Sequence, residues 1–198
     1  EEESVVGCPV DPYVEDDYFE ALKALGERAQ KSDSNLVLMG IEPTYPSEKY
    51  GYIIPLGKEA VSRVSVFKEK PTKEVAKEYI EEGALWNGGV FAFRLGYVLD
   101  RAHELIDFVD YDDLFSKYET LNKISFDYAV VEHESEIEVM RFAGTWKDLG
   151  TWNTLTEAMD SCAVGEALFN ENCENVHVVN ELDIPILCMG LSDVVVSA

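Results

Sequence analysis

The stretch NLVLMGI, residues 35–41, is a continuous apolar run of strand length. A strand that is apolar on both faces is typical of a sheet covered by helices on each side. Residues 15–35, just before it, carry apolar side chains at helical spacing and acidic residues in the first turn, where these complement the helix dipole. Further upstream, residues 4–10 predict a buried strand that ends in a turn at Asp11-Pro12. Strand, helix and strand in this order indicate an α/β fold.

The middle of the chain alternates strand-like and helix-like segments. Residues 50–57 and 61–70 predict two strands joined as a hairpin, and residues 72–83 predict a helix that stops at Gly83. Six more elements follow: a strand with a glycine break at 84–95, helices at 97–106 and 110–119, a helix capped by Ser125, a strand at 137–144 and a helix at 151–161. Short strand-like runs over residues 163–198 predict a β-rich region.

Composition excludes several classes of partner. The net charge of −23 comes from 39 acidic and 16 basic residues, and so acidic a surface repels nucleic acid and anionic membranes. A small phosphorylated substrate stays compatible, because a divalent cation and a few lysines act at short range. The four cysteines lack a CxxC spacing and the three histidines are far apart, which argues against zinc and thiol-histidine chemistry. We expect a cytoplasmic protein with reduced thiols and no membrane span.

Two aspartates are candidate ligands for a metal ion. Asp11 and Asp148 each follow an apolar strand, and ligands of open α/β sheets gather at the carboxyl ends of strands. Two carboxylates there suit Mg²⁺, which prefers oxygen ligands and often shares them with a substrate phosphate. Trp146 and Trp152 flank Asp148 and are expected to hold it in one rotamer. The alternatives are a turn or helix-capping role for Asp11 and a solvated turn for Asp148.

The motif FKEKP, residues 67–71, is a candidate phosphate and sugar site. Strand alternation would place Lys68 and Lys70 on one face and Glu69 on the other. Two cations could then face a phosphate while the carboxylate faces a sugar hydroxyl. The alternative is an edge strand that is protected from aggregation by its charges.

Three further positions carry polar groups or glycines where a ligand could approach. Asn87 and Gly88 interrupt an apolar strand, as glycines do at bulges or at close contacts with a ligand. Asp127 lies in the first turn of a helix, where the helix dipole alone would also explain it. Tyr50 and Gly51 begin a strand, most simply as part of a turn.

The order of these motifs is more informative than any one of them. The segments CPVDPYV, GIEPTYPSEKYGYI, VSVFKEKP, LWNGGVFAF, SFDYAVVE and WKDLGTW occur in this order along the chain. The series resembles the bacterial mannose-1-phosphate guanylyltransferases of the sugar-nucleotidyltransferase superfamily, from about Val5 to Asp160. The resemblance implies a Rossmann-like (GT-A-like) α/β fold with a mixed sheet flanked by helices, and a short β-rich C-terminal appendage.

The resemblance also implies roles for individual residues. Asp11 and Asp148 match the carboxylates that hold the catalytic metal, Mg²⁺ or another divalent cation, and Lys70 matches a catalytic cation. The substrate-binding positions that the resemblance implies are Tyr50, Gly51, Glu69, Lys70, Asn87, Gly88 and Asp127. Two departures bear on fine specificity: Pro12 stands where the family usually has histidine, and Gly88 where it often has serine.

The reaction that the resemblance implies converts mannose 1-phosphate and GTP to GDP-mannose and pyrophosphate, and it suggests a homodimer. Residues 1–162 are expected to form the catalytic domain and residues 163–198 the start of the C-terminal region. The family's glycine-rich triphosphate loop does not occur in this sequence, so we expect an N-terminally truncated domain that is inactive or nearly so alone.

Three alternatives stay open at this point. The first is an enzyme of the same superfamily that uses another sugar 1-phosphate or another nucleoside triphosphate. The second is a non-catalytic relative that binds a sugar phosphate or a partner chain and has a regulatory role, although a pair of metal carboxylates would serve no purpose there. The third is a structural α/β domain in which the motifs are packing features.

Overall fold

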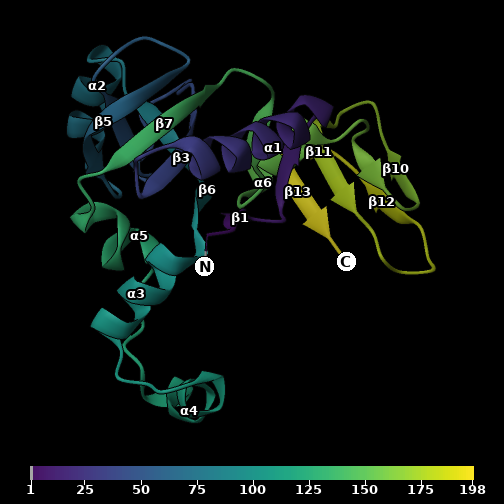
Figure 1. Ribbon diagram of the computed structural model, residues 1–198. Helices are drawn as coiled ribbons and strands as arrows, with labels where there is room; N and C mark the ends of the chain where they lie inside the picture. The colour runs from purple at the N-terminus through teal and green to yellow at the C-terminus, as the bar shows by residue number, and fades with distance from the viewer. Residues whose placement is uncertain (1) are drawn as a thin grey trace. The chain divides into compact units, whose positions relative to one another are not determined.

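The computed structural model describes residues 2–198, which form two compact units (Figure 1). The first unit contains the residues up to Val10 and Val14–Thr145, and the second contains Asp11–Tyr13 and Trp146–Ala198. The expected fold class is confirmed, because the first unit has a mixed sheet with helices and the C-terminal part adds further strands. The assignment of residues 1–162 as one catalytic domain stays a prediction.

The sheet of the first unit has six strands in the order β1-β6-β3-β7-β5-β4. Its strands are β1 (Ser4–Gly7), β3 (Leu36–Ile41), β4 (Tyr52–Pro55), β5 (Val61–Lys68), β6 (Leu85–Arg94) and β7 (Ile137–Phe142). β3 lies between β6, to which it is antiparallel, and β7, to which it is parallel. All six residues of β3 are buried, as its continuous apolar sequence predicts. The expected hairpin is also confirmed, since β4 and β5 pair in antiparallel fashion.

The N-terminal strand differs from its prediction. β1 ends at Gly7 and pairs only with β6, at the edge of the sheet, with a half-buried rather than a buried pattern. Pro12 does not end this strand but begins a separate one, β2 (Pro12–Val14). Proline lacks an N–H and is tolerated as the first residue of a strand, so a proline next to an apolar run does not by itself mark a strand end.

The helices of the first unit follow the predicted order along the chain. They are α1 (Asp16–Lys31), α2 (Lys73–Glu81), α3 (Leu95–Leu105), α4 (Tyr111–Lys117) and α5 (Phe126–Ala129), with 3₁₀ turns η1 (Tyr118–Thr120) and η2 (Val131–His133). Ser125 caps α5 as expected, because its side chain accepts a hydrogen bond from the Tyr128 N–H. Among residues 2–198 no helix has both the length and the apolar content that crossing a bilayer requires.

The centre of the first unit is packed closely enough to require a glycine at position 40. A Cβ on Gly40 would lie 2.5 Å from a Leu85 methyl group and 2.7 Å from a Val139 methyl group. Interiors are packed to crystal density, so any side chain here would force the strands apart. The buried cluster around this point comprises Leu36, Leu38, Ile53, Leu85, Val130, Val131, Ile137 and Val139.

One partly buried ion pair joins α1 to the sheet. The Arg28 guanidinium donates two hydrogen bonds to the Glu138 carboxylate on β7, from Nε at 2.7 Å and from a terminal nitrogen at 2.8 Å. The Glu138 side chain is 9% exposed, while Arg28 is 40% exposed. The bond from Arg28 is the main cause that lowers the pKa of Glu138, so the carboxylate stays ionised.

The second unit is built mainly from parallel strands. β2 pairs with β8 (Trp146–Asp148), and α6 (Trp152–Ala158) follows. The remaining strands are β9 (Ala163–Val164), β10 (Ala167–Phe169), β11 (Glu174–Val179), β12 (Ile186–Cys188) and β13 (Ser192–Ser197). Val178 on β11 pairs with Ala163 on one side and with Val196 on the other, while β10 pairs with β12, all in parallel. Successive turns of chain therefore stack as coils of a β-solenoid.

Replacing Arg28 with alanine should destabilise the first unit, because it leaves the buried Glu138 carboxylate without its partner. We expect a loss of about 1–3 kcal/mol in the free energy of unfolding, measured by urea denaturation at neutral pH. Lys31→Ala is the matched control on the same helix, since Lys31 and its partner Glu27 are both largely exposed. The control should change stability by less than about 0.5 kcal/mol. Equal effects of both substitutions would contradict the role given to Glu138.

Candidate active site

The first unit holds a buried carboxylate directly after strand β5. The Glu69 side chain is 7% exposed, and its Oε1 lies 3.1 Å from Nζ of Lys70. Within residues 2–198 its second oxygen, Oε2, is buried without a hydrogen-bond partner. Burial raises the pKa of Glu69, and the hydrogen bond from Lys70 opposes that shift. A buried oxygen without a partner is costly, so this atom is a candidate acceptor for a group on a ligand.

Gly51 and Asn87 lie beside this carboxylate. A Cβ on Gly51 would come within 2.5 Å of Glu69 Oε2 and 3.2 Å of the Asn87 Cβ. The Gly51 carbonyl also accepts a hydrogen bond from the Asn87 N–H, at 2.8 Å. A side chain at position 51 would therefore displace the Glu69 carboxylate from its place, while the hypothesis of a sugar site here stays a prediction.

Asn87 is oriented by a bulge and by an aspartate. Opposite β3, Leu38 pairs with Phe91 but Gly40 pairs with Asn87, so β6 bulges between these positions, as expected from its glycines. Gly89 has a φ of +70° and its N–H donates to the Asn87 side-chain oxygen at 3.1 Å. The Asn87 Nδ2 donates to Asp127 Oδ1 at 2.7 Å. These bonds fix which end of the amide is the donor and which is the acceptor.

An aromatic group borders these residues. The Tyr50 ring lies 4.9 Å from the ring of Trp86, centroid to centroid, and Tyr45 packs on the same indole at 5.0 Å. The Trp86 Nε1 donates to the buried Tyr52 hydroxyl at 3.1 Å. Trp86 was not among the predicted site residues. Its place directly before Asn87 and the rarity of tryptophan in the chain were the signals that could have identified it.

The strand alternation expected over residues 68–70 is wrong. β5 ends at Lys68, and Lys70 adopts a left-handed backbone with φ +45°. The Lys68 ammonium pairs with Glu132 at 3.2 Å, while the Lys70 ammonium pairs with the neighbouring carboxylate of Glu69. The two lysines therefore do not form one cationic face. The hydrogen bond that Lys70 donates to Glu69 is the main cause that raises the pKa of Lys70, so this lysine stays protonated beside the carboxylate.

The two predicted metal carboxylates belong to the second unit. Asp11 directly precedes β2, Asp148 is the last residue of β8, and these two strands pair with each other. Paired strands lie about 4.8 Å apart, so the two aspartates project from neighbouring backbone segments. The Asp148 Oδ1 accepts a hydrogen bond from the Gly150 N–H at 2.8 Å. This backbone hydrogen bond orients Asp148. Trp152 is 50% exposed, and the expectation that Trp146 and Trp152 hold Asp148 in one rotamer stays a prediction.

This donor set suits a magnesium ion that is shared with a substrate. Across residues 2–198, no group of three or more His, Cys, Asp or Glu side chains is arranged to hold a metal. Asp148 keeps Oδ2 outside its turn bond, and Asp11 is exposed. Mg²⁺ is commonly bound through one or two carboxylates and completes its shell with water and phosphate oxygens. The residues present therefore fit Mg²⁺, and their role as its ligands stays a prediction.

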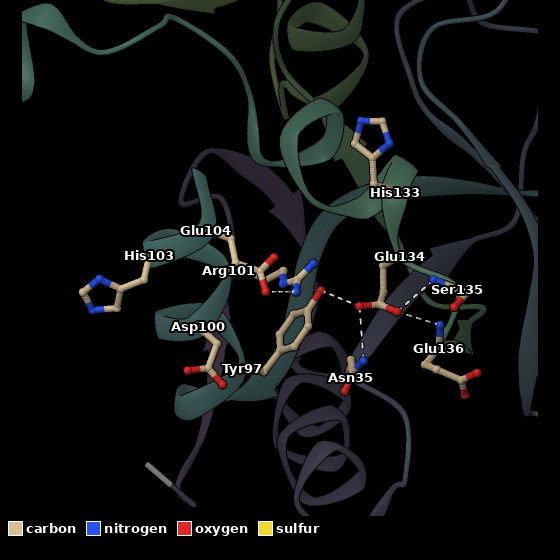
Figure 2. A pocket seen from close by; sticks show the side chains of 10 residues that line it. All are labelled: Asn35, Tyr97, Asp100, Arg101, His103, Glu104, His133, Glu134, Ser135 and Glu136. Atoms are coloured by element: carbon tan, nitrogen blue, oxygen red, sulfur yellow. Dashed lines mark hydrogen bonds and ion pairs between the residues drawn. The ribbon is translucent and has the colours of Figure 1, made fainter. Parts of the chain in front are cut away.

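A pocket of about 650 Å³ also lies in the first unit, and none of the predicted site residues lines it (Figure 2). At its wall, the Glu134 carboxylate accepts hydrogen bonds from the Tyr97 hydroxyl at 2.7 Å and from the Asn35 amide at 3.2 Å. It also accepts the backbone N–H groups of Ser135 and Glu136. Since both carboxylate oxygens of Glu134 are hydrogen-bonded within the protein, this residue joins α3, the residue before β3 and the turn before β7.

The fold is that of the nucleotidyl transferase family, as comparison with known proteins shows. A family profile described as Nucleotidyl transferase matches residues 1–164, and the chain belongs to this family. Among solved structures, the chain is similar to one described as a mannose-1-phosphate geranyltransferase from Thermus thermophilus, with 31% identity and a TM-score of 0.76. The match covers 99% of this chain and 63% of that one.

Curated relatives agree with this family. The chain is 30% identical over 188 residues to the mannose-1-phosphate guanylyltransferase of Escherichia coli (strain K12), covering 81% of this chain and 39% of the relative. It is 30% identical over 230 residues to the alginate biosynthesis protein AlgA of Pseudomonas aeruginosa, covering 98% and 46%. The chain thus spans less than half the length of these curated relatives. A UDP-glucose pyrophosphorylase, 18% identical with a TM-score of 0.52, shares the fold.

Replacing Glu69 with glutamine should make the protein more stable at neutral pH. Because its pKa is raised in the folded state, Glu69 favours folding below the ordinary glutamate pKa, and this contribution is lost as the pH rises through the folded value. An uncharged glutamine avoids the cost of burying an ionised carboxylate at neutral pH. The Lys70 ammonium, which is exposed, is then solvated by water in place of its bond to Glu69. We expect a gain of about 0.5–2 kcal/mol in unfolding free energy at pH 7 that fades at pH 4.

The control for this substitution is Glu78→Gln, an exposed position on α2. Its unfolding free energy should stay within about 0.5 kcal/mol of wild type at both pH values. A Glu69→Gln variant that is less stable than wild type at pH 7 would show that the carboxylate stabilises the fold and is not strained for a ligand.

Proposed function

We propose that the protein is a mannose-1-phosphate guanylyltransferase, which transfers GMP from GTP to mannose 1-phosphate and releases pyrophosphate. The observation that carries this proposal is the buried Glu69 carboxylate with one unpaired oxygen, set between a cation and a glycine, in a chain of the nucleotidyl transferase family. The choice of mannose and guanine rests on the relatives at about 30% identity.

The chemistry of the Glu69 cluster suits a sugar phosphate. Carboxylate and amide oxygens accept hydrogen bonds from sugar hydroxyls, and Glu69 Oε2 lies against Gly51 without a hydrogen-bond partner among the described residues. Lys70 adds a positive charge beside this acceptor, as a phosphate requires. Asn87, oriented by Asp127, presents a second polar side chain at the same place. In the proposal these groups bind the hexose and its 1-phosphate.

The reaction requires positioning and charge stabilisation and no covalent enzyme intermediate. An oxygen of the sugar phosphate attacks the α-phosphorus of GTP in line, a new P–O bond forms, and the bond to the pyrophosphate oxygen breaks. Lys70 holds the attacking phosphate and offsets charge on its oxygens. Glu69 and Asn87 fix the sugar so that the attacking oxygen points along the reaction axis.

Asp11 and Asp148 are proposed to bind the divalent cation of the reaction, Mg²⁺. When bound, the ion would supply positive charge at the phosphate oxygens. The Gly150 amide keeps Asp148 oriented for this role, because the carboxylate cannot rotate without losing that hydrogen bond. A cytoplasmic location and a homodimer stay predictions.

Calorimetric titration with sugar phosphates tests the proposed substrate site. Mannose 1-phosphate should bind the purified protein, and mannose without its phosphate should bind at least about tenfold more weakly because Lys70 loses its partner. Asn87→Ala should weaken binding of mannose 1-phosphate by about ten- to a hundredfold. Asn122→Ala, at an exposed asparagine, is the matched control and should bind as wild type does. Equal affinity of mannose and mannose 1-phosphate would argue against the site.

A product assay then tests the reaction. The protein is incubated with GTP, UTP or dTTP and with mannose 1-phosphate or glucose 1-phosphate, and the sugar nucleotide and pyrophosphate are measured. GDP-mannose should be the preferred product wherever turnover is detected. Preferred formation of another sugar nucleotide would keep the reaction type but replace its substrates. Sugar-phosphate binding without turnover in any combination would agree with the expectation that these 198 residues are inactive or nearly so alone, and would not by itself favour the non-catalytic alternative.

Removal of the metal carboxylate should be visible in ligand binding as well as in turnover. Asp148→Asn should raise the Mg²⁺ concentration that half-saturates binding of GDP-mannose by at least about tenfold. Asp160→Asn, an exposed aspartate after α6, is the control and should leave the Mg²⁺ dependence unchanged. Binding of GDP-mannose that is equally strong with Mg²⁺ and with a chelator would contradict the role of Asp11 and Asp148.

A further inference from the structure

Glu132, in the 3₁₀ turn η2, touches the segment that carries the buried carboxylate. Its Oε1 accepts a hydrogen bond from the backbone N–H of Glu69 at 3.1 Å and another from Nζ of Lys68 at 3.2 Å. The Glu132 side chain is only 18% exposed. The bond from the Glu69 N–H is the main cause that lowers the pKa of Glu132, so the acceptor is ionised at neutral pH.

The backbone at this point needs an acceptor from outside the sheet. The strand ends at Lys68, so the next N–H, that of Glu69, lies beyond the end of β5. The following residue, Lys70, is held in the left-handed region at φ +45°, which costs a lysine about 1–3 kcal/mol. Such a conformation persists only where its surroundings hold it, and the Glu132 carboxylate is the side chain that binds the turn at Glu69.

The same segment also holds the other side of the site. Asp127, five residues earlier on α5, accepts the hydrogen bond that orients Asn87 on β6. Between the two acidic residues, Val130 and Val131 are 7% and 0% exposed and belong to the buried core. One short segment, anchored by these valines, therefore places one carboxylate against the end of β5 and another against β6.

Glu132 also affects which of the two lysines, Lys68 or Lys70, lies beside Glu69. Its carboxylate binds the Lys68 ammonium, and the left-handed turn places the Lys70 ammonium beside Glu69. Without Glu132, the turn would lose its acceptor and Lys68 would lose its partner, so both the position of Glu69 and the distribution of positive charge would change.

We propose that Glu132 is a positioning residue of the sugar-phosphate site, which holds the turn at residues 69–70 in its binding geometry through the backbone N–H of Glu69. This inference rests on the proposed function, since it assumes that Glu69 and Lys70 bind a sugar phosphate. Glu132 itself does not touch the substrate.

Two substitutions at this position separate the acceptor from the charge. Glu132→Gln keeps a side-chain oxygen that can accept the Glu69 N–H, whereas Glu132→Ala removes it. Glu136→Gln is the matched control, because Glu136 is a nearby exposed glutamate that pairs with Arg63, away from the turn. For each variant, amide hydrogen exchange at Glu69 is measured in the unliganded protein, and the affinity for mannose 1-phosphate by calorimetry.

We expect Glu132→Ala to exchange faster at the Glu69 amide and to bind mannose 1-phosphate about ten- to a hundredfold more weakly. Glu132→Gln should restore slow exchange and bind within about threefold of wild type, and Glu136→Gln should match wild type. Affinity should follow the exchange rate at Glu69 and not the melting temperature. A general loss of stability would not produce this pattern.

Three results would overturn the inference. The first is wild-type affinity in Glu132→Ala, and the second is a Glu132→Gln variant as weak as Glu132→Ala. The third is unchanged exchange at the Glu69 amide in Glu132→Ala. That result would show that the Glu132 side chain does not protect this amide, independently of which substrate binds. Absence of sugar-phosphate binding by the wild type, with faster Glu69 exchange in Glu132→Ala, would overturn the proposed function and leave Glu132 a residue that supports only the fold.

Discussion

The close approach of β3 to its neighbours at Gly40 is the constraint on which the rest of the first unit depends. The register pairs Gly40 with Asn87 and Ile41 with Trp86, so this closely packed part of the sheet also supports the candidate site. The bulge that follows in β6 places more residues in β6 than in β3 between the pairs Leu38–Phe91 and Gly40–Asn87, and it orients Asn87. Core packing and site geometry are thus set by the same pair of strands.

Much of the architecture could be predicted from the sequence because local patterns and burial agree. The apolar run of β3 predicts a fully buried central strand, the glycines of β6 predict a bulge, and Ser125 predicts a helix start. The burial of the first strand, β1, and its place in the sheet could not be predicted in this way. Its apolar residues pattern like a buried strand, yet β1 lies at a sheet edge, and only the partner strands determine that.

The candidate site residues could be named from the sequence, but their geometry could not, and their roles stay predictions. Motif order pointed to Glu69, Lys70, Asn87 and Asp127, and the structure brings these four together in the first unit. The side-chain alternation rule failed at Lys70, because it holds only while the backbone stays extended. Glu132 was not identified from the sequence, since a contact between positions 63 residues apart leaves no local pattern.

The parallel coils of the second unit have a consequence for how that part of the chain loses structure. β11 is hydrogen-bonded to β9 on one side and to β13 on the other, whereas β9 and β13 each pair with β11 alone among the described strands, and apolar side chains from β9–β13 pack into one small core. Thermal unfolding of these strands should therefore begin at a terminal coil and proceed to the next coil along the chain. The buried side-chain amide of Asn180 donates hydrogen bonds to the carbonyls of Glu166 and Ile184 across one bend, and these bonds should oppose unfolding of that coil.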